Sequence, residues 1–171
     1  MAKVFLILKV LRLSTLYDID VTEDGSFQFT SDNGHKYIVY FLAAPVPDKE
    51  GNVHTFLNLG FSRDGDHACN PFTTKFDAKI EATIISILND VFEKHDHRVL
   101  IYFCFGDDGY SRHRKIVFNR WKKGLTRSIE NHNATIQYEE TEIFSCLMLV
   151  SDNPLKGLIL DAFEAYLKDY Q

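Results

Sequence analysis

Apolar and polar residues alternate along the first third of the chain with the two-residue period of β-strands. Phe27 and Phe29, for example, alternate with polar neighbours, as in a strand that buries one face. The pattern predicts strands over residues 17–21, 26–30, 36–44 and 53–61. Asp24-Gly25 and Asn33-Gly34 are dipeptides preferred in tight turns, and they predict the first two connections of an antiparallel meander.

The third predicted strand differs from the others because residues 36–44 are apolar almost throughout. A continuous apolar run is typical of a central strand that is covered on both faces. Residues 45–52, which include three consecutive charged residues, predict a loop before the fourth strand.

After residue 76 the apolar residues recur every three or four positions, which is the period of a helix. We therefore predict an amphipathic helix over residues 76–94, for which Thr73 or Thr74 is a suitable N-cap. A second helix is predicted over residues 111–123, with Gly124 ending it at the C′ position. The apolar face of the first helix consists of Ile80, Ile84, Ile87, Leu88 and Val91.

Three further strands and a last helix complete the prediction. Apolar and aromatic runs indicate strands over residues 98–105, 134–138 and 142–150. Asp152 or Asn153 can cap a final helix in which Pro154 takes the first helical position. Its buried side is predicted to carry Leu158, Phe163 and Leu167.

The resulting element order is β-β-β-β-α-β-α-β-β-α, which defines an α+β fold. We expect the N-terminal meander, followed by α-β-α-β-β-α, to form a single mixed or antiparallel sheet with helices packed on it. The length of 171 residues suits one domain, which we assign to residues 15–171. Residues 1–14 are predicted to be an additional strand or a poorly ordered arm.

The charge and the cysteine content limit the binding partners and the cellular location expected for this domain. A formal net charge of −5 disfavours nonspecific binding of the whole surface to nucleic acid. Cys104 and Cys146 each lie inside an apolar run, where a buried free thiol is expected, and Cys69 makes the count odd. These features favour a reducing, cytoplasmic location. The apolar run at residues 4–8 is too short to span a membrane.

The second predicted helix is strongly basic. Between Gly109 and Ile129 the chain contains no Asp or Glu, although its net charge is negative. Such segregation creates a local positive field. The basic residues of this stretch are Arg112, Arg114, Lys115, Arg120, Lys122, Lys123 and Arg127.

Arg112 and Arg114 lie in the first turn of that helix, where the helix dipole is already positive, so an anion is expected nearby. Asp107 and Asp108 immediately precede the helix and can supply it internally. The anion can instead belong to an acidic protein, a nucleotide or a nucleic-acid backbone, which arginine holds in a bidentate manner. In that case Arg112 and Arg114 are the anchoring pair, and Asp107 and Asp108 orient them.

The sequence gives weaker support to metal-binding and phosphate-binding sites. Asp107 and Asp108 can hold Mg²⁺ with a third carboxylate from Glu81 or from the group Glu139, Glu140 and Glu142, but no spacing selects one. His67, Cys69, His95 and His97 lack zinc-finger spacing. Residues 106–109 match neither phosphate-binding glycine motif. We therefore assign no catalytic residue, metal or cofactor, and we expect Trp121 to pack in the core.

The string formed by Asp108, Arg112, Arg114, Phe118 and Trp121 resembles a family of short uncharacterised bacterial proteins, a domain of unknown function found mainly in Bacteroidetes. The similarity extends over residues 17–167. It implies a cytoplasmic accessory protein in a mobile-element or defence-related gene neighbourhood, and it carries no activity or catalytic residue with it.

The functional expectation is a small non-enzymatic binding or regulatory protein that engages an acidic protein surface through its basic helix. Six basic residues are predicted to bind this partner: Arg112, Arg114, Lys115, Arg120, Lys122 and Lys123. The alternative is a nucleic-acid-binding protein or a metal-dependent nuclease. The sequence leaves the oligomeric state open.

Overall fold

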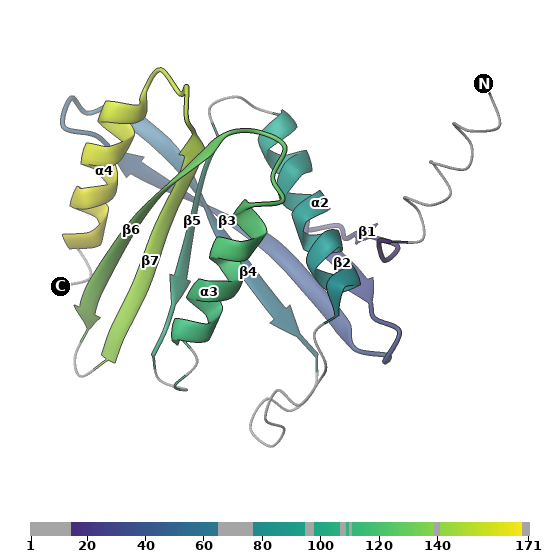
Figure 1. The fold of residues 1–171 in the computed structure, drawn as a ribbon. Coiled ribbons are helices and arrows are strands. Elements are labelled where there is room, and N and C mark those ends of the chain that lie inside the picture. The colour runs from purple at the N-terminus through teal and green to yellow at the C-terminus, as the bar shows by residue number, and fades with distance from the viewer. Residues whose placement is uncertain are drawn as a thin grey trace. The chain divides into compact units, whose positions relative to one another are not determined.

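The computed structural model describes residues 15–64, 77–94, 98–106, 109, 111–138 and 141–168 (Figure 1). Within these residues the chain forms seven strands and three helices in the predicted order. The elements are β1 (Asp20–Val21), β2 (Phe27–Thr30), β3 (Lys36–Pro47), β4 (Val53–Arg63), α2 (Ala78–Lys94), β5 (Val99–Cys104), α3 (Ser111–Lys122), β6 (Ile129–Tyr138), β7 (Thr141–Val150) and α4 (Lys156–Lys168). The predicted N-terminal strand or arm at residues 1–14 lies outside the described residues.

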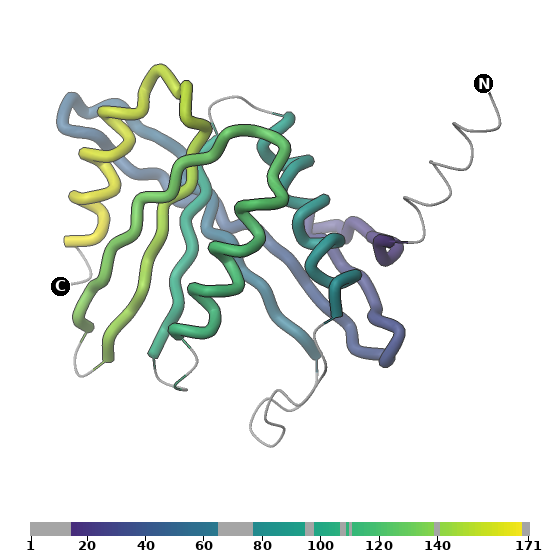
Figure 2. Tube along the Cα trace, viewed as in Figure 1, coloured from purple at the N-terminus to yellow at the C-terminus, as the bar shows by residue number. Residues whose placement is uncertain are grey.

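The strands form one mixed sheet in the order β1-β2-β3-β4-β5-β7-β6. The N-terminal strands make the predicted antiparallel meander, whereas β5 is parallel to β4 and antiparallel to β7. β6 and β7 pair antiparallel over their whole length. The predicted α+β class is therefore confirmed, and the path of the chain through it can be followed in Figure 2.

The contacts group the chain into two compact units. The first unit contains residues up to Tyr40 together with Phe61–Ile87, and the second contains Phe41–Gly60 together with residues from Leu88 onward. Each unit is described separately below.

In the first unit, four aromatic rings stack in series. The rings of Tyr17, Phe29, Tyr37 and Phe61 follow one another with centroid distances of 5.7, 5.2 and 5.6 Å and nearly parallel planes. Phe29 and Tyr37 face each other across the β2–β3 pair, so the alternation visible in the sequence gathers the rings on one face. The same alternation buries Phe29 and Val39.

Tyr17 ties the start of the described chain to α2. Its backbone N–H donates to Thr83 Oγ1 at 2.9 Å, and its hydroxyl donates to Asp77 Oδ2 at 2.8 Å. Asp77 also caps α2, because its Oδ1 accepts from the N–H of Lys79 at 2.8 Å. The predicted caps, Thr73 and Thr74, lie outside the described residues. Burial of the Tyr17 ring raises the pKa of its hydroxyl to about 12.

Three hairpin loops share one hydrogen-bond pattern. In each, the first residue donates its N–H to the carbonyl four positions on, and a glycine at the fourth position donates back to the first residue. The three glycines all have positive φ angles near +80°, which Gly adopts without steric cost. The turn at Asn33-Gly34 is therefore a three-residue loop with a glycine bulge rather than a two-residue turn. The loops begin at Thr22, Ser31 and Asp48 and contain Gly25, Gly34 and Gly51.

The predicted boundaries of three strands were wrong by three residues or more. β1 begins at Asp20 instead of residue 17. β3 extends through Pro47, because Val46 is 2% exposed in the core of the second unit. It is also not covered on both faces, since Leu42 is 61% exposed. β6 begins at Ile129 instead of residue 134, because its polar first half pairs with the apolar end of β7, from Ile129 opposite Val150 onward.

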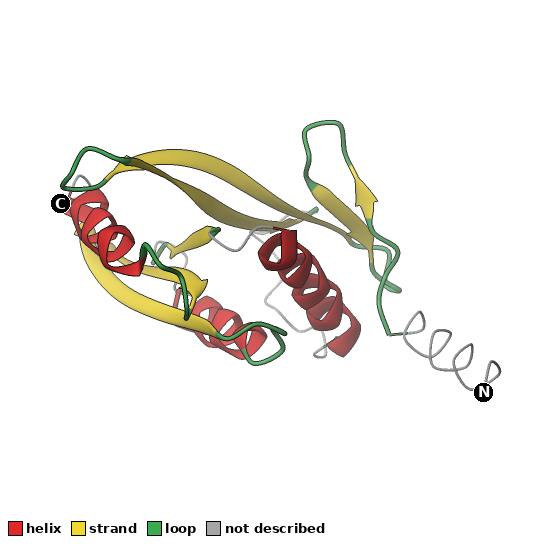
Figure 3. Ribbon diagram, turned by 90° about the horizontal axis from the view of Figure 1, so that it is seen from above, coloured by secondary structure: helices red, strands yellow, loops and turns green. Residues whose placement is uncertain are grey.

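In the second unit, alternate residues of β5 face opposite helices. Ile101 belongs to the hydrophobic core that includes Ile159 and Phe163 of α4. Its neighbour Tyr102 stacks on Phe118 of α3, with ring centroids 4.2 Å apart. The helices α3 and α4 thus cover opposite faces of this part of the sheet (Figure 3).

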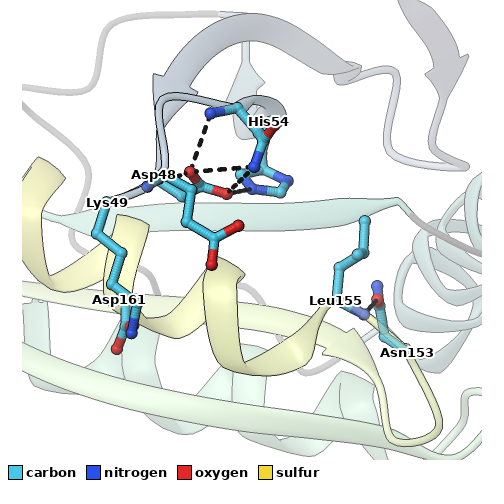
Figure 4. Close-up of polar contacts among 8 residues, drawn as sticks. Asp48, Lys49, His54, Asn153, Leu155 and Asp161 are labelled. Carbon is cyan, nitrogen blue, oxygen red and sulfur yellow. Dashed lines mark hydrogen bonds and ion pairs between the residues drawn. The ribbon is translucent and has the colours of Figure 1, made fainter.

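The predicted cap of α4 is confirmed, although the helix begins at Lys156 and not at Pro154. The side chain of Asn153, one of the two predicted caps, accepts a hydrogen bond from the N–H of Leu155 at 2.9 Å (Figure 4). Phe163 and Leu167 are buried as predicted, whereas Leu158 is only partly buried. The buried face also contains Ile159 and Ala162.

Candidate functional site

Helix α3 is held against the sheet by aromatic side chains. Phe118 and Trp121 are its buried residues, and Trp121 packs edge-on against Phe118 with a centroid distance of 4.7 Å. The prediction that Trp121 is a core residue is confirmed, since it is 4% exposed. With this face fixed, the polar and basic positions of α3 lie along the remaining circumference.

A groove with a volume of about 440 Å³ lies between α3 and β7. Helix α3 contributes Ser111, Arg112, Lys115, Ile116 and Asn119, and β7 contributes Glu142 and Phe144. The five helical positions follow the i, i+1, i+4, i+5, i+8 spacing of one helix face. Two of the six basic residues predicted to bind a partner, Arg112 and Lys115, therefore line one groove.

Lys115 is positioned by an aromatic ring. Its Nζ lies 3.8 Å from the ring centroid of Phe144, which is a cation–π contact. This contact keeps the ammonium group in the groove while its remaining hydrogen-bonding directions stay available to a ligand. Arg112 is exposed and has no ion-pair partner within the described part of the chain.

The far end of the groove is neutral and polar. Asn119 Oδ1 accepts a hydrogen bond from Asn131 Nδ2 of β6 at 3.3 Å. This bond orients the amide of Asn119 and directs its nitrogen, which is a donor, away from Asn131.

The groove also has apolar surface and one acid. Ile116 is 55% exposed and is one of seven large apolar side chains exposed among the described residues. It places aliphatic surface beside the two cations of the groove. Glu142 is exposed at the start of β7. The backbone here packs closely against the loop before α3: a Cβ at Gly106 would lie 2.7 Å from the carbonyl oxygen of Glu142, so only glycine fits at this position.

The other predicted basic residues lie outside this groove. Arg114 donates from Nη2 to the carbonyl oxygen of Phe105 at 3.4 Å and is partly buried. Arg120 and Lys123 are exposed, and Lys122 is partly buried. The predicted orienting residues Asp107 and Asp108 lie outside the described residues. The structure therefore brings Arg112 together with Lys115, not with Arg114.

Sequence reasoning missed Phe144, Ile116 and Asn119 as members of this site. Phe144 lies in the predicted strand β7, so the alternation of that strand shows on which side of the sheet its ring lies. The sequence does not show that α3 packs beside this ring. Ile116 lies within the basic stretch but carries no charge, so the charge pattern did not select it.

No metal or nucleophile site emerges in the residues that the structure describes. They contain no group of three or more His, Cys, Asp or Glu that could hold a metal ion. His67, Cys69, His95, His97, Glu139 and Glu140 lie outside them. Cys104 and Cys146 are free and buried as predicted, and burial raises the pKa of each thiol to about 11.

A second polar cluster lies in the β3–β4 hairpin (Figure 4). The carboxylate of Asp48 accepts hydrogen bonds from the N–H groups of Glu50 and Asn52 at 2.8 and 2.9 Å, and His54 Nε2 lies 2.8 Å from its Oδ2. Burial opposes ionisation, but these hydrogen bonds outweigh it and lower the pKa of Asp48 to about 2. Every oxygen is engaged in shaping the loop, so we interpret this cluster as structural.

The same hairpin is joined to α4. Lys49, the next residue of the loop, forms an ion pair with Asp161 of α4 (Figure 4). The carboxylate of Asp161 raises the pKa of Lys49. Both side chains are largely exposed, so this pair contributes little to stability.

The fold and the groove define an α+β protein with a basic, partly apolar groove beside one helix. The chain belongs to the family of unknown function DUF6169, which matches residues 76–165, just over half of the 171 residues. This range is shorter than the one over which the resemblance was expected, but it includes the whole groove. No curated protein and no solved structure matches the chain. Among the described helices, none has the length and apolarity needed to cross a membrane.

Proposed function

We propose that this chain is a small cytoplasmic binding or regulatory protein without enzymatic activity, of bacterial origin, that engages an acidic surface of a partner protein through α3. The observation that carries the proposal is the groove in which Arg112 and Lys115 flank the exposed Ile116. A positive, partly apolar groove on an acidic protein attracts an acidic partner selectively, because the rest of the surface repels it.

The local electrostatics support an anionic partner. The first turn of α3 contains no acidic residue, so the N–H groups and dipole of the helix add to the charges of Arg112 and Lys115. The basic residues further along, including Lys122 and Lys123, extend the positive field without lining the groove.

The test is an affinity pull-down from the native host with matched charge variants. The first variant combines Arg112→Glu with Lys115→Glu, and the control combines Lys94→Glu with Lys168→Glu. Both change the net charge equally, but the control residues lie outside α3. A protein retained by the wild type and the control but lost with the first variant supports the proposal.

Two results count against it. If nothing is retained although all variants keep the wild-type circular dichroism spectrum, the basic helix is a structural feature. If only nucleic acid is retained, and its affinity falls steeply as the salt concentration rises, the alternative of a nucleic-acid-binding protein is favoured instead. For duplex DNA this dependence on salt has a logarithmic slope of about −0.9 per phosphate contacted.

A further inference from the structure

The dimensions of the groove select the form of its ligand. Its helical lining runs from Ser111 to Asn119, a rise of about 12 Å at ~1.5 Å per residue. An extended peptide advances about 3.3 Å per residue, so about four residues of an extended chain match this length. The groove lies open between a helix and a strand, which suits a continuous segment of chain.

The order of charged and apolar side chains along the groove indicates the chemical nature of its ligand. Arg112 and Lys115 supply two cations near the N-terminal end of α3, and a carboxylate can accept hydrogen bonds from both. Ile116 lies between them and Asn119 on the same face. An apolar side chain that covers Ile116 removes exposed aliphatic surface from water.

Phe144 adds to the apolar part. One region of its ring carries the ammonium group of Lys115, and the remaining surface lines the groove. A phosphate backbone or a free inorganic anion would satisfy Lys115 but would leave Ile116 exposed. A peptide that combines acidic and apolar side chains satisfies both.

We propose that the groove binds an acidic peptide segment of about four residues in an extended conformation. One carboxylate side chain lies at Arg112 and Lys115, and a neighbouring aliphatic or aromatic side chain lies against Ile116 and Phe144. This inference rests on the proposed function, because it specifies which part of the acidic partner enters the site.

Glu142 has the opposite effect from the two cations. Its carboxylate belongs to the same lining and repels an acidic ligand. Glu142→Gln should therefore strengthen binding by about twofold, as expected for like charges roughly 8 Å apart in water. If the groove did not recognise the charge of its ligand, Glu142→Gln would not change the affinity in the direction opposite to the Arg112 and Lys115 variants.

The experiment begins with selection of a displayed library of random seven-residue peptides on the full chain. We expect enrichment of peptides in which Asp or Glu flanks an aliphatic or aromatic residue. The Arg112→Glu, Lys115→Glu double variant should retain none of them.

Affinity measurements on one synthetic selected peptide then test the apolar contact. Ile116→Ser should weaken binding about tenfold, as expected for loss of a buried aliphatic side chain. It should not change the melting temperature, because Ile116 is exposed. Replacing the apolar residue of the peptide by serine should cost a similar factor, and the two changes together should cost clearly less than their product.

The inference is overturned if no acidic peptide is enriched, if the selected peptides bind the double variant equally well, or if Ile116→Ser leaves their affinity unchanged. If the pull-down still captures a protein that charge reversal releases, but no short peptide is enriched, the partner binds through a folded surface. The proposed function then stands and this inference falls. If both experiments fail, the proposed function falls as well.

Discussion

Asp48 shows how one side chain defines a loop. Its carboxylate accepts hydrogen bonds from Glu50, Asn52 and His54 and has a pKa of about 2. Because the folded-state pKa is lower than that of an unfolded aspartate, near 3.9, the stabilisation is present above about pH 4 and is lost as the pH falls through 2.

We therefore expect Asp48→Asn to lower the melting temperature by several degrees at pH 7, with the difference from wild type shrinking as the pH approaches 2. Thermal unfolding followed by circular dichroism between pH 2 and 7 checks this. Glu50→Gln, which leaves the backbone N–H of residue 50 in place, is the matched control and should have little effect. A difference that is constant with pH would mean that the carboxylate charge has no part in stabilising the loop.

The buried hydroxyl of Ser145 lowers the stability of the folded protein. Ser145 is 1% exposed, and among the described residues its hydroxyl has no hydrogen-bond partner. A buried hydroxyl without a partner costs about 1–3 kcal/mol. Ser145→Ala should thus raise the free energy of unfolding by about 1 kcal/mol, measured by urea titration. Ser151→Ala, which removes hydrogen bonds to Ser128 at 2.9 and 3.0 Å, should not stabilise the protein. Equal effects of both changes would contradict this account.

At the level of elements, glycine has two different roles. Gly51 lies in a hairpin loop with a φ of +85° and open space around its missing Cβ, so only backbone strain opposes a side chain there. Gly157 lies in α4 with equally open space and no positive φ. Gly51→Ala should destabilise the protein by about 1–2 kcal/mol, whereas Gly157→Ala should stabilise it by about 0.5 kcal/mol through helix propensity. Urea titration of both variants distinguishes these signs, and a shared sign would refute the interpretation.

Elements whose conformation is determined by their own residues were predicted from the sequence, whereas elements determined by a partner strand were predicted less well. The period of apolar residues was sufficient to locate α2 and the meander strands, although not the end of β3, because their own side chains determine which face is buried. It was insufficient for the first half of β6, where Asn131 and Asn133 have low strand propensity and the partner strand β7 determines the conformation. The pairing of β5 with β7 likewise joins residues 40 to 50 positions apart in the chain, from Cys104 opposite Phe144 to Val99 opposite Leu149, and no local pattern encodes it.

The candidate site was predictable only in part for the same reason. The clustering of cations on α3 is a property of twelve consecutive residues and was visible in the sequence. That Arg112 shares a groove with Lys115, and that Phe144 and Glu142 complete it, depends on how α3 packs on β7. This packing is fixed by the buried Phe118 and its contact with Tyr102.

For the whole molecule, the buried thiols offer a probe of cooperative unfolding. Cys104 and Cys146 lie on the neighbouring strands β5 and β7 of the second unit and are 0% and 1% exposed. Burial raises the pKa of both thiols to about 11, so at pH 8 only about one thiol in a thousand is the reactive thiolate. Native protein should therefore react with a thiol reagent only when the second unit opens.

We expect the Cys69→Ser variant to react with Ellman's reagent very slowly in native buffer and to release two equivalents of product in guanidinium chloride. The two thiols should be labelled at one common rate, because β5 and β7 pair along six residues and are buried in a shared core. The free energy derived from labelling should then equal that from denaturant titration. Rapid labelling of one thiol in native buffer would show instead that part of the second unit opens independently, and it would make that cysteine a candidate for chemistry that its burial argues against.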